Sequence, residues 1–208
     1  MRLRNVKNKE EILNNSSYLV KNPMDNKGKW NKVFNNNNPI YIEIGMGKGK
    51  FIIENAIKYP NINFIGIEKF DSVLAKSLPK IPEGLNNLLI IRLDALNIDS
   101  IFDKEIDRIY LNFSDPWPKV RHHLRRLTSK VFLGKYDFIF KKTCEIYQRT
   151  DNRDLYIYSL ESYSQYGYKL YDISFDFHNT TEEELITTEY EDKFSDKGMP
   201  IYSVIARK

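Results

Sequence analysis

Apolar residues along this chain gather into short runs that end at glycine, proline or acidic residues. A short apolar run bounded by turn-forming residues is typical of a strand buried on both faces of a sheet. The sequence predicts four such strands, at residues 40–44, 63–68, 88–93 and 109–113, and a fifth strand at residues 145–149. A polar or glycine-containing segment follows each run, which indicates a turn at every strand end.

Between the predicted strands, apolar residues recur at the spacing of one helical face. This spacing predicts helices at residues 9–14, 50–59, 72–78 and 154–165, and one that begins after Thr128 and Ser129. Thr128 and Ser129 are residues that cap helix N-termini, and so are residues 150–152. Gly167 stands where a helix ending near Gln165 needs a left-handed residue.

The order of these elements alternates between strand and helix, which predicts an α/β fold. Residues 169–175 and 201–206 add two strands that form a closing antiparallel pair. We therefore expect a mostly parallel seven-stranded sheet, Rossmann-like, with an antiparallel closing strand and helices on both faces. The length of 208 residues favours a single domain, with residues 39–208 as its α/β core.

Residues 1–38 form a polar N-terminal arm in which lysines and arginines are dispersed among asparagines. The asparagine run at residues 35–38 predicts a loop, because it offers no apolar surface to bury. Two interpretations of the arm stay open. It is either a floppy basic leader, or an arm that contacts an anionic partner or closes over a site.

Composition narrows the class of protein. The single cysteine, Cys144, excludes an intrachain disulfide framework and fits a reducing compartment. We expect a cytoplasmic protein with no membrane partner, because there is neither a signal peptide nor an apolar run that spans a bilayer. His122, His123 and His178 lack paired ligand spacing, so no metal is expected. Whether the protein is a monomer or a homodimer stays open.

The predicted strand ends carry an unusual set of acids and glycines. In an open α/β sheet, ligands bind beyond the carboxyl ends of the strands. Those ends carry a glycine loop at residues 45–49 and four acids, which are Glu68, Asp94, Asp115 and Asp151. The glycines are spaced G-x-G-x-G, whereas a dinucleotide pyrophosphate needs G-x-G-x-x-G.

The acids favour a cofactor with a cationic tail. Glu43, just before the glycine loop, suits an ammonium group and would repel a phosphate. Glu68 is placed to accept hydrogen bonds from both ribose hydroxyls, and Asp94 to meet the exocyclic amine of an adenine. S-adenosylmethionine satisfies all three, so we expect it as the cofactor.

A rigid loop, Asp115-Pro116-Trp117-Pro118, follows the fourth predicted strand, and a basic segment at residues 121–126 comes directly after it. The prolines stop the strand and stiffen the loop. Such a loop is suited to bind a flat polar molecule, and the cations that follow it are suited to bind a polyanion. The ordinary alternative is a proline-terminated strand with a solvated basic helix behind it. Trp117 packs either on a base or cofactor, or into the core as the anchor of the loop.

These motifs resemble those of the bacterial tRNA (guanine-N7-)-methyltransferases, a family of class I S-adenosylmethionine-dependent enzymes. The resemblance covers nearly the whole chain and rests on residues 43–49, 112–119, 125–128, 150–153, 188–191 and 197–202. It implies transfer of a methyl group to N7 of a guanine in the tRNA variable loop (position 46 of the tRNA). The chain departs from the family pattern at Phe70, Asp71 and Leu124 and in the turn at residues 141–144.

The resemblance also implies roles for particular residues. The expected cofactor-binding residues are Glu43, Gly45, Gly47, Glu68, Asp94 and Asp115, and Asp115 is the expected catalytic residue. The residues expected to bind the tRNA partner are Lys119, Arg121, Arg125, Arg126, Asp151, Thr188, Glu189, Tyr190 and Glu191. Among them, the basic residues of the segment at 119–126 are expected to contact phosphates.

Guanine N7 carries a free lone pair, so its methylation needs no general base. We therefore expect rate enhancement mainly from positioning, with Asp115 or Glu191 accepting from the opposite edge of the guanine. Three alternatives remain at this point. They are an NAD-dependent oxidoreductase on the same layered fold, an RNA-binding module without turnover, and methylation of guanine in another RNA.

Overall fold

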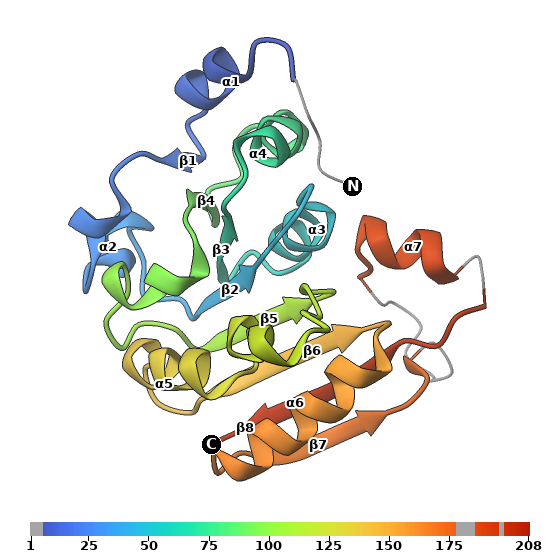
Figure 1. Ribbon diagram of the computed structural model, residues 1–208. Helices are drawn as coiled ribbons and strands as arrows, with labels where there is room; N and C mark the ends of the chain where they lie inside the picture. The colour runs from blue at the N-terminus through green and yellow to red at the C-terminus, as the bar shows by residue number, and fades with distance from the viewer. Residues whose placement is uncertain (1–5, 178–185, 196–197) are drawn as a thin grey trace.

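The computed structural model describes residues 6–177, 186–195 and 198–208 (Figure 1). His178 and Lys197, which the sequence analysis includes, lie outside these residues. In the described part of the chain, eight strands form one sheet. They are β1 (Leu19–Val20), β2 (Ile40–Ile44), β3 (Asn63–Glu68), β4 (Leu88–Arg92), β5 (Arg108–Asn112), β6 (Glu145–Thr150), β7 (Lys169–Ser174) and β8 (Tyr202–Arg207).

The sheet has the order β1-β4-β3-β2-β5-β6-β8-β7, and β2 lies near its centre. All strand pairings are parallel except those of β8, which is antiparallel to both β6 and β7. This arrangement confirms the expected α/β fold with one antiparallel closing strand. It adds β1, which sequence periodicity missed because two residues are too short to show a period.

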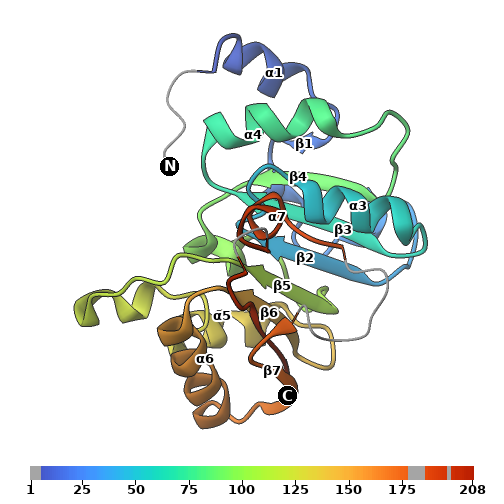
Figure 2. The same cartoon turned by 90° about the vertical axis from the view of Figure 1, so that its right-hand side faces the viewer.

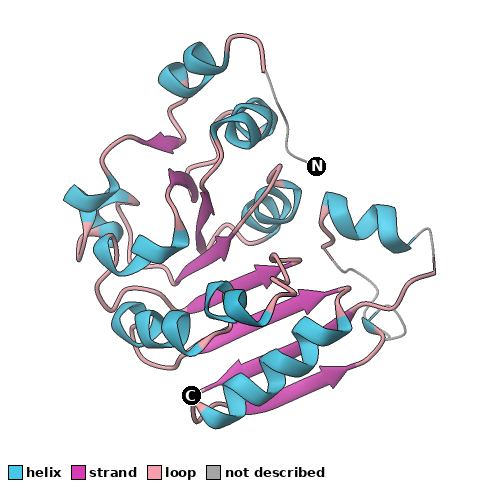
Figure 3. Ribbon diagram, in the orientation of Figure 1, coloured by secondary structure: helices cyan, strands magenta, loops and turns pink. Residues whose placement is uncertain are grey.

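Helices cover both faces of the sheet (Figure 3). The α-helices are α1 (Lys9–Asn15), α2 (Trp30–Val33), α3 (Lys50–Lys58), α4 (Asp71–Ser77), α5 (Lys130–Ile139), α6 (Arg153–Gln165) and α7 (Glu189–Ser195). Short 3-10 turns are η1 (Pro23–Asn26), η2 (Leu78–Lys80), η3 (Ala95–Ser100) and η4 (Val120–Arg125). One apolar core packs α1, α3 and α4 on the sheet, and a larger one packs α2, η3, α5 and α6 on its other face.

Two helix ends match their sequence signals and two differ. The Asn152 side chain accepts a hydrogen bond from the Leu155 amide (2.8 Å), and Gly167 has a φ of 95° just after α6. Ser129 stands at the N-cap of α5, but its hydroxyl donates to the Leu124 carbonyl (3.0 Å) instead of capping the helix. The helix predicted at residues 72–78 ends one residue early, at Ser77, and the turn η2, which contains Pro79, continues directly from it.

The described part of the N-terminal arm packs against the sheet rather than lying free. β1 pairs with the edge strand β4, which covers the unpaired edge that β4 would otherwise present. The Trp30 side chain is fully buried, and its indole donates to the Ile101 carbonyl (2.7 Å). The Glu105 carboxylate accepts from the backbone amides of Gly28 and Trp30 (both 2.9 Å). A floppy leader is therefore the wrong description of residues 6–38.

Candidate functional site

A cavity of about 640 Å³ lies beyond the carboxyl ends of β2, β3, β4 and β5. Five of the site residues predicted from the sequence line it, and they are Gly45, Glu68, Asp94, Asp115 and Arg125. Two positions that depart from the family pattern, Phe70 and Leu124, also line it. The cavity therefore occupies the edge of the sheet where parallel α/β proteins bind ligands.

Glu43 lies beside this cavity but inside the protein. Its side chain is 2% exposed, and the Asn112 amide donates to Oε1 (2.9 Å). The other oxygen, Oε2, is buried and accepts no hydrogen bond from the described residues. Burial raises the pKa of Glu43 to about 7, and the hydrogen bond from Asn112 only partly opposes that shift. A buried carboxylate oxygen without a donor is a site that a cationic group would stabilise.

The glycine loop turns tightly above Glu43. The Gly45 and Met46 amides both donate to the Ile67 carbonyl (2.8 and 3.1 Å), which ties the loop to the neighbouring strand β3. Gly45 and Gly47 have φ values of 81° and 57°, in the left-handed region that favours glycine. The G-x-G-x-G spacing thus reflects a backbone path that brings the loop close to the cavity.

Glu68 and Asp94 are both held by backbone amides at strand ends. Glu68 Oε1 accepts from the amides of Lys69 (2.8 Å) and Phe70 (2.9 Å). Burial raises the pKa of Glu68, although hydrogen bonds from Phe70, Lys69 and Gly47 oppose the shift. Asp94 is more exposed, and its Oδ1 accepts from the Leu96 amide (3.0 Å) at the start of η3. These bonds fix two carboxylates on the wall of one cavity.

The loop between β5 and η4 has two non-glycine residues in the left-handed region, Phe113 with a φ of 50° and Trp117 with a φ of 41°. Such residues are strained and persist where surrounding contacts hold them. The Phe113 amide donates to the Arg149 carbonyl (2.9 Å). The Arg126 guanidinium donates to the carbonyls of Pro116 (2.8 Å) and Trp117 (3.3 Å). The loop that carries Asp115 is therefore held at both ends.

The predicted cations separate into two groups. Lys119, Arg121 and Arg125 are exposed, on the yellow-green segment that projects from the body of the molecule in Figure 2. The Arg125 guanidinium also lies over the Trp117 ring, 5.0 Å from its centre. Arg126 is only 4% exposed, and its charge faces the loop carbonyls and the Tyr158 ring. The structure thus brings Arg126 together with the loop and not with the three exposed cations.

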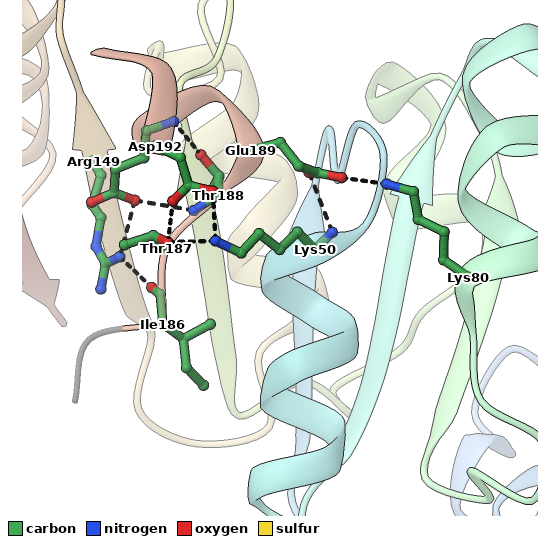
Figure 4. A network of polar contacts seen from close by, with 9 residues as sticks. Lys50, Lys80, Arg149, Ile186, Thr187, Thr188, Glu189 and Asp192 are labelled. Atoms are coloured by element: carbon green, nitrogen blue, oxygen red, sulfur yellow. Dashed lines mark hydrogen bonds and ion pairs between the residues drawn. The ribbon is translucent and has the colours of Figure 1, made fainter. Parts of the chain in front are cut away.

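The Thr188–Glu191 segment forms the first turn of α7 (Figure 4). The Glu191 amide donates to Thr188 Oγ1 (2.9 Å), and the Thr188 amide donates to Glu191 Oε2 (3.2 Å). This reciprocal pair is a capping box. Glu191 is fully buried, and its Oε2 lies 3.5 Å from an Arg149 guanidinium nitrogen. The Glu191 carboxylate is therefore held in place by the Thr188 amide and by Arg149.

Tyr190 connects α7 with the cavity wall. Its hydroxyl donates to Asp151 Oδ2 (3.0 Å), and its ring centre lies 5.1 Å from that of Phe113. Asp151 and Tyr190 thus come together beside the loop that carries Asp115. Glu189, the remaining residue of this motif, instead contacts Lys50 and Lys80 near the glycine loop.

Two residues of this region were missed from the sequence, Asn112 and Arg149. Asn112 is the only donor to Glu43 found among the described residues, and Arg149 donates to the Ile186 carbonyl (2.9 Å) as well as facing Glu191. Asn112 is the last residue of β5 and follows three buried residues of that strand, so a polar residue at that position was an available signal. Arg149 is partly buried in β6, where buried and partly buried positions alternate, and the strand pattern gave no signal for its role.

Neither a metal cluster nor a membrane span is found in the part of the chain that the structure describes. No group of three or more histidine, cysteine or acidic side chains there has an arrangement that could hold a metal ion. No helix there combines the length and the apolar character that crossing a bilayer requires.

The arrangement of the sheet is that of class I S-adenosylmethionine-dependent methyltransferases. A solved structure of the 16S rRNA methyltransferase KamB superposes with a TM-score of 0.65 at 12% identity, over 86% of this chain and 92% of that one. A structure of an antibiotic-related methyltransferase gives a TM-score of 0.63 at 16% identity, over 87% and 92%. At these identities the likeness concerns the fold alone.

Sequence comparison identifies the particular family. Residues 37–204 match the model of a family described as putative methyltransferase. A tRNA (guanine-N(7)-)-methyltransferase of Lachnoclostridium phytofermentans is 51% identical over 99% of this chain and 98% of the relative. One of Bacillus velezensis is 48% identical over 92% and 89%. The chain belongs to the tRNA (guanine-N(7)-)-methyltransferase family, which confirms the resemblance found in the motifs.

Proposed function

We propose that this protein transfers a methyl group from S-adenosylmethionine to N7 of a guanine in the variable loop of tRNA (position 46 of the tRNA). Its relatives carry that enzyme name over almost the full chain, which supports the substrate class. The observation on which the cofactor assignment rests is the buried Oε2 of Glu43 beside the glycine loop, which has no hydrogen-bond partner among the described residues. Family membership leaves no support for the oxidoreductase alternative.

The residues of the cavity fit the proposed cofactor. Glu43 would hold its ammonium group, because Oε2 lacks a donor from the described residues. Glu68 would accept from the ribose hydroxyls, and Asp94 from the adenine amine, since both line the cavity. When bound, S-adenosylmethionine supplies an electrophilic methyl group on a sulfonium centre. The remaining contribution of the chain is to orient the guanine.

We assign that orienting role to Asp115 rather than to Glu191. Guanine N7 already has an in-plane lone pair, so catalysis requires position and not proton removal. The opposite edge of guanine presents two donors, N1–H and the amino group, which suit one carboxylate. The Glu191 carboxylate is buried and engaged in the capping box, whereas Asp115 is exposed at the cavity. Lys119, Arg121 and Arg125 would contact tRNA phosphates.

An Asp115→Ala variant tests this proposal. We expect tRNA methylation to fall about 100-fold, because a misplaced base loses most of the positioning effect. The donor dissociation constant should change less than about threefold, in contrast. Single-turnover transfer of a labelled methyl group to unmodified tRNA, followed by mapping of the modified base, measures the first quantity, and calorimetry measures the second.

The matched control is Asp103→Ala, an exposed acid in the turn before β5. It should methylate tRNA as the wild type does. A wild-type protein that binds tRNA without methylating it would support the non-catalytic alternative. A methyl group mapped to a different RNA or base would refute the assigned substrate. Equal losses of donor binding and methylation in Asp115→Ala would make Asp115 a donor-site residue only.

A further inference from the structure

Helix α7 is docked onto the first turn of α3, directly after the glycine loop (Figure 4). We propose that Lys50, the first residue of α3, is a positioning residue that holds residues 187–192 in a fixed place relative to the glycine loop. The inference rests on the proposed function, because residues 187–192 include the Thr188–Glu191 segment on the expected tRNA side. It assigns a role to a residue outside the cofactor cavity.

Lys50 makes two side-chain contacts with this segment. Its ammonium group donates to Asp192 Oδ2 (2.6 Å) and to Thr187 Oγ1 (2.8 Å). The Thr187 hydroxyl in turn donates to the other Asp192 oxygen, Oδ1 (2.6 Å). The three side chains therefore form a closed ring of hydrogen bonds. One cation thus fixes residues at both ends of the segment.

The backbone of Lys50 adds a third contact. Its amide, at the N-terminus of α3, donates to Glu189 Oε2 (3.4 Å), while the Lys80 ammonium group pairs with Glu189 Oε1. In dinucleotide-binding proteins, the corresponding amides face a pyrophosphate. Here the chain supplies its own carboxylate to that position. The G-x-G-x-G spacing of the loop and the Glu189 carboxylate at its amide therefore both argue against a phosphate bound at this position.

The opposite side of the segment is fixed to the sheet. Arg149, in β6, donates to the Ile186 carbonyl (2.9 Å) and faces the Glu191 carboxylate. Between Arg149 and Lys50 lie Thr188 and Tyr190, and Tyr190 contacts Asp151 and Phe113 beside the loop that carries Asp115. The position of these two residues relative to the glycine loop thus depends on the contacts of Lys50 with Thr187 and Asp192.

Loss of Lys50 should shift the segment without unfolding the protein. A helix as short as α7, with seven residues, is not stable by itself, so its position depends on tertiary contacts. The Lys50–Asp192 pair is partly exposed, with side chains 27% and 46% accessible, and pairs of this kind contribute little to global stability. The sheet and its two cores do not depend on this pair.

The test compares Lys50→Met, Lys50→Arg, Asp192→Asn and the Lys50→Met/Asp192→Asn double variant, with Lys76→Met as the control. Lys76 is an exposed lysine of α4 outside the network. In Lys50→Met we expect kcat/KM for tRNA to fall about five- to tenfold, while the donor dissociation constant stays within about twofold. Lys50→Arg should recover most of the loss. The double variant should lose no more than the worse single variant, because both changes remove one interaction.

A second readout does not depend on activity. Amide hydrogen exchange across residues 187–192 should be faster in Lys50→Met than in Lys76→Met, since the segment loses its anchor. Equal methylation by these two variants, unchanged exchange, or a donor affinity that falls as much as kcat/KM would each overturn the role of Lys50. A wild type without methyl transfer would refute the proposed function instead. Faster exchange in Lys50→Met would then still show that Lys50 anchors residues 187–192.

Discussion

At the scale of single residues, Glu43 is the most consequential group of the cavity. It is a carboxyl group held away from water with one oxygen bonded to Asn112 and the other without a donor from the described residues. Such an arrangement disfavours the charged form, which is why the pKa of Glu43 rises to about 7. A cationic ligand reverses that preference. Donor binding should therefore be coupled to loss of a proton from Glu43.

This coupling predicts that the donor binds more tightly as the pH rises. Below the raised pKa, Glu43 is protonated, and each unit of pH makes the carboxylate about tenfold more available, up to a plateau above pH 7. Calorimetry between pH 5.5 and 8 should show that trend, with about one proton released per donor bound at the acidic end of the range and release fading above pH 7. Glu43→Gln should bind weakly at every pH and release no proton. A wild-type affinity that is the same at pH 6 and pH 8 would contradict the assignment.

The same carboxyl group affects the stability of the ligand-free protein. Its folded pKa lies above the unfolded value near 4.5, so the native state holds the proton longer than the unfolded chain. The cost of ionising Glu43 therefore appears as pH rises from about 4.5 to about 7, and stability falls over that range. This direction is opposite to that of an ion-paired surface carboxylate. Part of the stability lost returns when a cation is bound.

Arg125 and Arg126 are neighbours with different environments, and this difference is testable. Arg125→Met should reduce the salt slope of tRNA binding by about 0.7–0.9, because it removes one exposed cation that we propose contacts a phosphate. Arg126→Met should leave the slope unchanged, since its guanidinium binds the Pro116 and Trp117 carbonyls. Its turnover should nevertheless fall, because the Asp115 loop loses its support. Binding isotherms at several salt concentrations measure both slopes, and equal reductions would place Arg126 on the tRNA.

At the scale of elements, the sequence patterns predicted those strands whose positions depend on the burial of apolar side chains. Strands β2 to β5 are largely apolar runs because helices cover them on both sides, so their positions followed from hydrophobicity. β1 was missed because its two residues give no periodicity. The start of α7 carried an available signal, since Thr188 and Glu191 have the spacing of a capping box.

Side-chain direction was beyond the reach of those patterns. Residues 119–126 are a run of cations in sequence, and nothing in the run distinguishes the inward Arg126 from the exposed Arg125. Lys50 and Asp192 are 142 positions apart, so their pairing depends on the finished fold. The acids at the strand ends were predictable because topology places all such ends on one edge. Their bonding partners were not, because these come from loops whose paths are set by packing.

At the scale of the whole molecule, the cavity and the Thr188–Glu191 segment lie at the carboxyl ends of the strands, while β1 of the N-terminal segment pairs with the edge strand β4 (Figure 1). Trp30 is central to the packing of the N-terminal segment. Its ring lies 5.5 Å from that of Phe102, inside the larger core, and Glu105 holds the backbone around it. The segment is thus part of the structural support of the domain.

Replacing Trp30 should therefore destabilise the protein without changing its chemistry. We expect Trp30→Ala to lower the free energy of unfolding by about 3–5 kcal/mol, because it leaves a large cavity in the core. Trp30→Phe should cost less, since the ring volume is largely kept and only the bond to Ile101 is lost. Urea unfolding measures both, and donor affinity of the folded variants should match the wild type. An unchanged midpoint for Trp30→Ala would mean that residues 6–38 are a detachable arm, whereas a weaker donor affinity in the folded variant would mean that the arm reaches the donor cavity through the core.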